Sequence, residues 1–91
     1  MDNLPGADLI STGLRDLADG RESEESLLVL VGGPRLRTLG FDVPATRAGE
    51  ELPEHRLYLL LATKHGDGAH SQYNALVRRL VSFERAAECA R

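Results

Sequence analysis

Three side chains that can bind metal ions lie close together in the sequence, at His65, Asp67 and His70. Imidazole and carboxylate groups bind zinc when they converge on one point with a fourth donor. No fourth ligand stands at a diagnostic spacing, because His55 lies at the far end of the preceding segment. We therefore expect no metal site and interpret the two histidines as solvated or capping side chains in a tight turn between helices.

The segment LLVLVGGPRLRTLG, from Leu27 to Gly40, contains a glycine pair that could cradle a phosphate. A P-loop needs two spaced glycines followed by Lys and Ser or Thr, whereas Pro34 and Arg35 follow this pair directly. The glycines do not match the spaced pattern of a dinucleotide-binding fold either. We expect no nucleotide and no other cofactor, and we interpret Gly32, Gly33 and Pro34 as structural residues that end one helix and begin another.

Nucleophilic catalysis has little support in the sequence. Cys89 is the single cysteine, which excludes an intramolecular disulfide, and no histidine lies nearby to activate its thiol. We expect this side chain to be buried or half-buried. No nucleophile-elbow motif is present, and a domain of 91 residues offers little room for a cleft. The chain is therefore predicted not to be an enzyme and to have no catalytic residues.

The composition is that of one small globular domain, which we expect to span residues 1–91. Hydrophobic residues make up 42% of the chain and aromatic residues 4%, so the core must consist mostly of Leu, Val and Ala. No apolar run approaches the roughly 20 residues that cross a bilayer, and the acidic N-terminus lacks the basic start of a signal peptide. These features predict a cytoplasmic protein without a membrane partner.

The net charge of −3 hides an uneven distribution along the chain. Residues 1–25 carry seven acidic and two basic side chains, whereas residues 55–91 carry six basic and three acidic ones. The basic part could bind an acidic partner or nucleic acid, but it could also pair with the acidic part of the same chain. We favour internal pairing.

Two short helices are predicted in the first third of the chain. Apolar residues recur at helical spacing over residues 7–18, which indicates an amphipathic helix. Ser23 can cap a second helix, whose first turn contains two glutamates. These start signals favour a helix over residues 27–31, although this apolar run is short enough to be a buried strand.

The remaining elements follow from proline and glycine positions. PRLRTL can form one short helix closed by Gly40, residues 41–52 are a loop by composition, and Pro53 can open the helix PEHRLYLLLATKH. A tight Gly-Asp-Gly connection leads to the last and longest helix, over residues 69–89. The prediction is an all-α fold, a compact bundle of about four to five helices. The alternative is an α+β fold with a short strand at residues 27–31.

An acidic residue interrupts the apolar face of the last helix. Apolar residues from Tyr73 to Ala87 cover about half of its circumference, and Glu84 falls near the middle of this face. A buried carboxylate without a partner is costly. Either the helix end frays outward and leaves Glu84 in solvent, or Glu84 accepts hydrogen bonds from Arg35 or Arg37 and fixes the short helix against the long one.

The helix that opens at Pro53 carries apolar side chains in every direction, from Leu57 to Leu61. It must be covered on more than one side, and in so short a chain one side can be left for a second molecule. Apolar and arginine side chains anchor many interfaces. The residues predicted to contact a protein partner are Tyr58, Leu59, Arg78, Arg79 and Arg85. Their alternative role is that of two core positions beside a solvated basic face.

Two other kinds of partner are compatible with the pattern. Two helices joined by a tight turn, with Arg78 and Arg79 on the second, can imitate a DNA-binding helix-turn-helix. An acidic chain without a basic run gains little from neutralising phosphates, so nucleic acid is not the expected partner and a small DNA-binding regulator is an alternative. A further alternative is a structural domain whose apolar helix faces a copy of itself.

The chain resembles, in its general sequence pattern, small helical antitoxins of bacterial toxin-antitoxin pairs. The segments that carry this resemblance are ESLLVLVGGPRLRTLG, HRLYLLLA and AHSQYNALVRRLVSFERAAE. These antitoxins accompany nucleotidyltransferase-like toxins, and the resemblance covers most of residues 8–90. It implies a non-catalytic protein that binds its toxin and keeps it inactive. It assigns no site residue, since an interface is a surface rather than a motif. We therefore expect an antitoxin-like inhibitor of a toxin-like enzyme.

Overall fold

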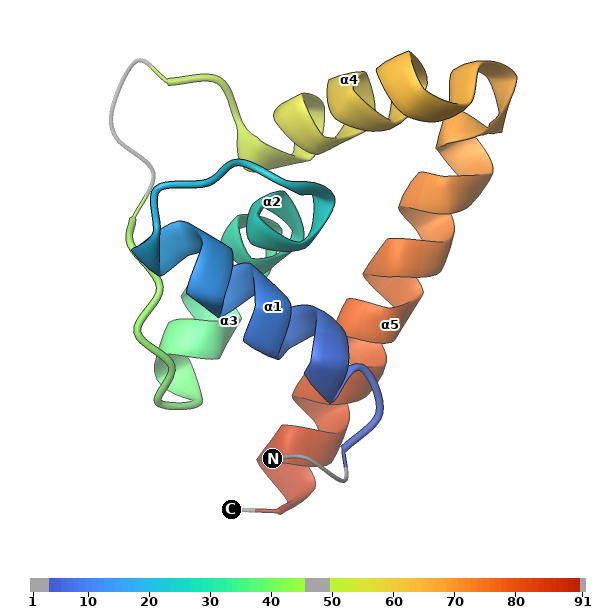
Figure 1. The fold of residues 1–91 in the computed structure, drawn as a ribbon. Helices are drawn as coiled ribbons and strands as arrows, with labels where there is room; N and C mark the ends of the chain where they lie inside the picture. Colours follow the sequence, from blue (N-terminus) through green and yellow to red (C-terminus); the bar gives the residue numbers. More distant parts are fainter. Residues whose placement is uncertain (1–3, 46–49, 91) are drawn as a thin grey trace.

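The computed structural model describes residues 4–45 and 50–90, and these residues form helices without any strand (Figure 1). In this part of the chain, the elements are α1 Ala7–Ala18, α2 Glu24–Val31, α3 Gly33–Thr38, α4 Pro53–His65, the 3₁₀ helix η1 Gly66–Gly68 and α5 Ala69–Cys89. The all-α prediction is confirmed, and α5 is the longest helix, with 21 residues. Residues 27–31 belong to α2, so the alternative with a strand there is wrong. None of the described helices is both long and apolar enough to cross a membrane.

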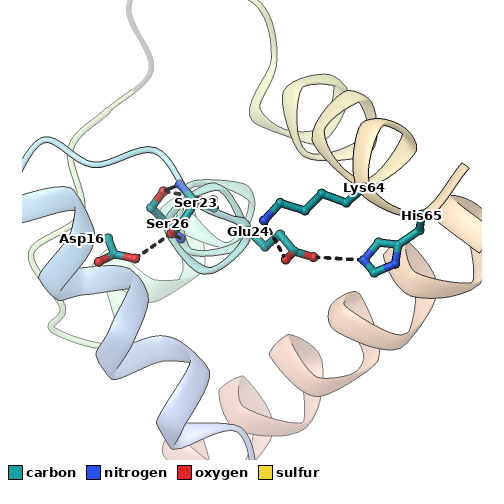
Figure 2. A network of polar contacts seen from close by, with 6 residues as sticks. All are labelled: Asp16, Ser23, Glu24, Ser26, Lys64 and His65. Carbon is teal, nitrogen blue, oxygen red and sulfur yellow. Dashed lines mark hydrogen bonds and ion pairs between the residues drawn. The ribbon is translucent and has the colours of Figure 1, made fainter.

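Ser23 caps α2, as predicted, through a reciprocal contact with Ser26. The Ser23 hydroxyl accepts a hydrogen bond from the Ser26 amide at 3.1 Å, and the Ser26 hydroxyl accepts one from the Ser23 amide at 2.7 Å. The Ser23 hydroxyl also donates to the buried carboxylate of Asp16 on α1 at 2.7 Å (Figure 2). The cap therefore sets the start of α2 and also ties it to α1.

α1 and α2 pack at very short range around Gly13. A Cβ atom on Gly13 would lie 2.4 Å from the backbone oxygen of Glu25 and 2.5 Å from Cγ2 of Val29. Ile10 lies nearly one turn before Gly13 on the same face and is fully buried. The apolar stripe of α1 thus meets α2 where only a hydrogen atom fits.

The core lies where α1, α2, α4 and the C-terminal half of α5 meet, and α2 occupies the angle between α4 and α5 (Figure 1). The largest fully buried hydrophobic side chains are Ile10, Leu27, Leu28, Val29, Leu36, Leu57, Leu61 and Phe83. Leucine dominates this set, as the composition predicts. Phe41 covers one edge of the core with its ring centroid 5.6 Å from that of Phe83.

The joint between α2 and α3 is built as predicted from Gly32, Gly33 and Pro34. Gly32 follows the last residue of α2, and Gly33 and Pro34 are the first two residues of α3. A Cβ atom on Gly32 would lie 2.8 Å from Cδ1 of the buried Leu80 on α5. The glycine therefore separates two helices and also allows α5 to approach their joint closely.

The predicted loop between α3 and α4 is described in part. Residues 41–45 and 50–52 have no helix or strand, in agreement with the loop expected over 41–52, and residues 46–49 lie outside the described ranges. Arg37 holds the first part of the loop, because its guanidinium donates to the carbonyl of Val43 at 3.0 Å and to that of Pro44 at 3.3 Å. Val43 is thereby anchored in the core.

α5 buries the face that the sequence predicts, but the expectation for Cys89 is wrong. Leu80, Phe83 and Ala87 are buried. Cys89 is exposed, because two residues beyond Ala87 correspond to about 200° of helical rotation, which turns the thiol to the opposite side.

The acidic N-terminal part and the basic C-terminal part pair within the chain, which confirms the internal pairing. Arg79 on α5 donates to the Asp8 carboxylate on α1 at 3.1 Å. Arg56 on α4 forms an ion pair with Glu22, which precedes α2. Each of these exposed pairs contributes little to the free energy of unfolding. The pairs nevertheless engage basic side chains that could otherwise contact a partner.

A third pair joins the start of α2 to the end of α4. Glu24 accepts a hydrogen bond from the ammonium of Lys64 at 3.3 Å and faces Nε2 of His65 at 3.7 Å (Figure 2). Glu24 lies in the first turn of α2, whereas the two cationic residues lie in the last turn of α4. Both helix dipoles favour this arrangement of charges.

Candidate partner-binding surface

α4 carries apolar side chains that the rest of the described chain leaves uncovered. Leu57 and Leu61 are fully buried, whereas Tyr58 is 39% and Leu59 is 49% exposed. Leu52, immediately before the helix, is 63% exposed. Within residues 4–45 and 50–90, these are the large hydrophobic residues with exposed side chains. Their exposure is compatible with the contact role expected for Tyr58 and Leu59, which stays a prediction.

Tyr58 and Leu59 face different sides of α4, because consecutive residues of a helix are about 100° apart. The ring of Tyr58 packs against that of Tyr73 on α5, with centroids 5.9 Å apart and planes tilted by 58°. Burial raises the pKa of the Tyr73 hydroxyl, and the nearby carboxylate of Glu54 raises this pKa further. The Tyr58 side of α4 is therefore engaged with α5.

Leu59 lines a shallow hollow of about 370 Å³, which we call the α4 hollow. Its lining residues are Glu22, Glu51, Arg56, Leu59, Leu60 and Thr63. Two leucines supply the apolar part, and charged side chains from α4 and from the segments before α2 and α4 supply the polar part. The hollow has the composition of a site for one apolar side chain of a partner, bordered by polar contacts.

The rim of the α4 hollow is more acidic than basic. Arg56 forms an ion pair with Glu22, so these two charges balance. Glu51 faces the imidazole of His55 at 3.7 Å, a partner that carries charge only when protonated. Glu50 joins Glu51 and Arg56 in lining an adjoining hollow. The α4 hollow itself thus has two carboxylates and one guanidinium, and the adjoining hollows add Glu50 on one side and Arg21 on the other.

Leu52 adds a second exposed apolar side chain near α4, but it lines a different hollow, with Leu30, Val31 and Pro53 among its lining residues. It is the N-cap residue of the helix, and Leu59 follows seven residues later, which is nearly two full turns. Leu52 does not appear among the contact residues predicted from sequence, because it was assigned to the loop. Its spacing from Leu59 is the signal that could have identified it. Glu22, by contrast, reaches the hollow through the tertiary fold, and no local pattern indicates this.

The three arginines expected at the interface are exposed on α5. Arg78 and Arg85 are seven residues apart and point to the same side. The guanidinium of Arg79 is turned to Asp8, which accepts at 3.1 and 3.3 Å. Arg79 therefore has a role inside the chain, while contact of Arg78 and Arg85 with a partner stays a prediction.

Glu84 is buried, with 5% of its surface exposed, so the helix does not fray outward at this position. Burial raises the pKa of its carboxyl group, and the nearby guanidinium of Arg35 lowers it in part. The hydrogen bond of Arg35 goes to Glu88, one turn further along α5, and that of Arg37 goes to the loop carbonyls. The predicted hydrogen bond to Glu84 is thus corrected: α3 is fixed to α5 by Arg35 and Glu88, because Glu88 lies at the solvent edge, where a flexible arginine can reach it.

His65, Asp67 and His70 do not converge on one point. His65 faces Glu24, and Nε2 of His70 lies 3.2 Å from the side-chain amide nitrogen of Asn74. No group of three His, Cys, Asp or Glu side chains that could hold a metal ion occurs among the residues that the structure describes.

No family model matches the chain, and it has no significant similarity to a curated protein or to a solved structure.

Proposed function

We propose that this chain is a non-catalytic protein-protein interaction module that binds a partner enzyme and inhibits it. The observation that carries the proposal is the exposure of Leu59 in the lining of the α4 hollow, together with the exposure of Leu52 immediately before the helix. Large aliphatic side chains in water, rimmed by charged residues, are typical of a surface that a protein partner covers. In its specific form, the proposal is an antitoxin-like inhibitor of a nucleotidyltransferase-like toxin in the bacterial cytoplasm, which the resemblance in sequence supports.

The distribution of charge favours a protein over nucleic acid as the partner. Arg56 and Arg79 pair with acids of the same chain, and Lys64 pairs with Glu24. Binding to a nucleic acid draws its affinity from cations that neutralise phosphates, and these ion pairs already engage part of the cations of a chain whose net charge is −3.

Coexpression tests the proposed function. A nucleotidyltransferase-like toxin should arrest growth when expressed alone, and this chain should relieve the arrest and copurify with the toxin. Persistent arrest together with the absence of a complex would rule out the antitoxin function. Concentration-dependent dimerisation of the chain without a foreign partner would instead favour the self-associating domain, and salt-sensitive DNA binding would favour the regulator.

A further inference from the structure

We propose that the α4 hollow forms a docking surface for an amphipathic helix of a protein partner, in which apolar side chains are flanked by lysine or arginine. This inference rests on the proposed function and deepens it, because it assigns the binding face and the chemistry of the partner segment. It starts from two observations, the apolar row along α4 and the acidic rim beside it.

The apolar row consists of the α4 residues that line the hollow. Leu59 is exposed, Leu60 lies beside it, and Thr63 follows one turn after Leu59. A helix that packs on such a row places its own side chains at positions i, i+3 or i+4, and i+7. The hollow beside Leu59 and Leu60, about 370 Å³ in volume, receives one of these side chains.

The acidic rim selects a basic partner segment. Glu22 and Glu51 line the hollow with one cation, Arg56, which Glu22 already binds, and Glu50 lies in an adjoining hollow beside Glu51. A lysine or arginine of the partner can lay its aliphatic stem over Leu59 while its charged end reaches the carboxylate of Glu51. An acidic partner segment would instead meet like charges along this rim.

The same charges disfavour a second copy of this chain as the occupant. A symmetric dimer through this face brings one rim against an identical rim. Glu50 and Glu51 of each copy would then add to the excess of carboxylates at the contact, with one Arg56 from each side already paired. A partner of opposite charge avoids this repulsion.

An NMR titration of the ¹⁵N-labelled full chain tests the inference with a defined probe. The probe is a synthetic amphipathic helical peptide with leucines on one face and lysines beside them, and the control peptide carries glutamates in place of the lysines. The basic peptide should shift the backbone amide signals of Glu51, Leu59, Leu60 and Thr63, and the acidic peptide should leave them in place.

Two substitutions and two matched controls locate the contact. Leu59→Ser and Glu51→Lys should each weaken binding of the basic peptide about tenfold or more, as is typical when an interface anchor is removed. Tyr58→Ser removes an apolar side chain from the other side of α4, and Asp67→Lys makes the same charge change in η1, so both should change the affinity less than about threefold. Circular dichroism spectra identical to wild type establish that each variant is folded.

Several results would overturn the inference. Equal affinity for the basic and acidic peptides, no binding of the basic peptide, or shifts centred on residues away from α4 would each do so. Equal effects of Glu51→Lys and Asp67→Lys would show that the peptide is attracted by the net charge of the chain and not by the rim of the α4 hollow. If the chain self-associates and Leu59→Ser abolishes this self-association, the α4 hollow binds a second copy of the chain.

This experiment and the coexpression experiment can fail separately. Peptide binding at α4 without inhibition of any toxin would leave the docking surface in place and remove the proposed function. Relief of growth arrest that Leu59→Ser and Glu51→Lys leave unchanged would support the function and overturn the docking surface.

Discussion

Gly13 of α1 packs directly against the backbone carbonyl of Glu25 in α2, so closely that a Cβ atom on residue 13 would lie 2.4 Å from the carbonyl oxygen. The obstructing atom belongs to a helix backbone and cannot move aside as a flexible side chain could. This contact sets the distance between α1 and α2, and α2 in turn supports the buried face of α4.

Gly13→Ala is therefore expected to destabilise the fold, although alanine favours a helix more than glycine does. Overpacking of this kind costs about 1–3 kcal/mol of the free energy of unfolding. Urea denaturation followed by circular dichroism measures the change. Gly68→Ala is the matched control, because a Cβ atom there would lie 3.7 Å from its nearest neighbour and meets no clash. Equal stability of the two variants would contradict the close packing of α1 and α2.

Glu84→Gln is expected to gain stability relative to wild type as the pH rises. Burial raises the pKa of Glu84 in the folded chain, so the folded state favours the protonated carboxyl group more than the unfolded state does. The stability contributed by this group is complete below the ordinary glutamate pKa and is lost as the pH rises through the folded pKa. Glutamine cannot ionise and avoids this loss.

The measurement for Glu84 is the urea midpoint of both proteins near the ordinary glutamate pKa and near neutrality. The difference between Glu84→Gln and wild type should shift in favour of the variant at neutral pH. Asp67→Asn, at an exposed carboxylate in η1, serves as the control for removing one negative charge. A difference that does not change with pH would show that Glu84 is not desolvated in solution.

Ser23→Ala is expected to lower the free energy of unfolding by about 0.5–2 kcal/mol, the usual range for loss of an N-cap. The substitution removes the acceptor for the Ser26 amide and also the hydroxyl that donates to the buried Asp16. Thermal denaturation provides the comparison with Ser82→Ala on the exposed side of α5. Indistinguishable stabilities of these two variants would be inconsistent with the capping box.

Arg79→Ala is expected to lower the free energy of unfolding by about 0.2–1 kcal/mol, because its ion pair with Asp8 is exposed to solvent. Arg78→Ala, at the neighbouring exposed position, should have no measurable effect on stability. A double-mutant cycle with Asp8→Ala at low and high salt isolates the pair. A coupling energy of zero at low salt would show that Arg79 does not interact with Asp8 in solution, and its side chain would then be available to a partner.

Local signals in the sequence were enough to predict most of the fold. The cap at Ser23, the proline at Pro53 and the Gly-Asp-Gly connection each act over a few residues, and the structure has helix boundaries at all three. Periodicity likewise predicted the buried face of α5. Even the exposure of Cys89 could have been read from the same periodicity.

The tertiary contacts were not predictable in the same way. The choice of Glu88 over Glu84 by Arg35 depends on how far α3 lies from each turn of α5, which only the packed structure defines. The α4 hollow combines Glu22 with Leu59, residues that are distant in the sequence and become neighbours when α2 packs on α4. A list of apolar and arginine residues could not show that Tyr58 and Leu59 belong to different sides of their helix.

We propose that this chain inhibits a partner enzyme through the Leu59 side of α4. The most direct measurement is the nucleotidyl-transfer activity of a purified nucleotidyltransferase-like toxin, titrated with the wild-type chain and with Leu59→Ser. The wild-type chain should abolish the activity, and Leu59→Ser should require a concentration about tenfold or more higher for the same inhibition. Full enzyme activity in excess wild-type chain, or equal inhibition by both chains, would contradict the claim.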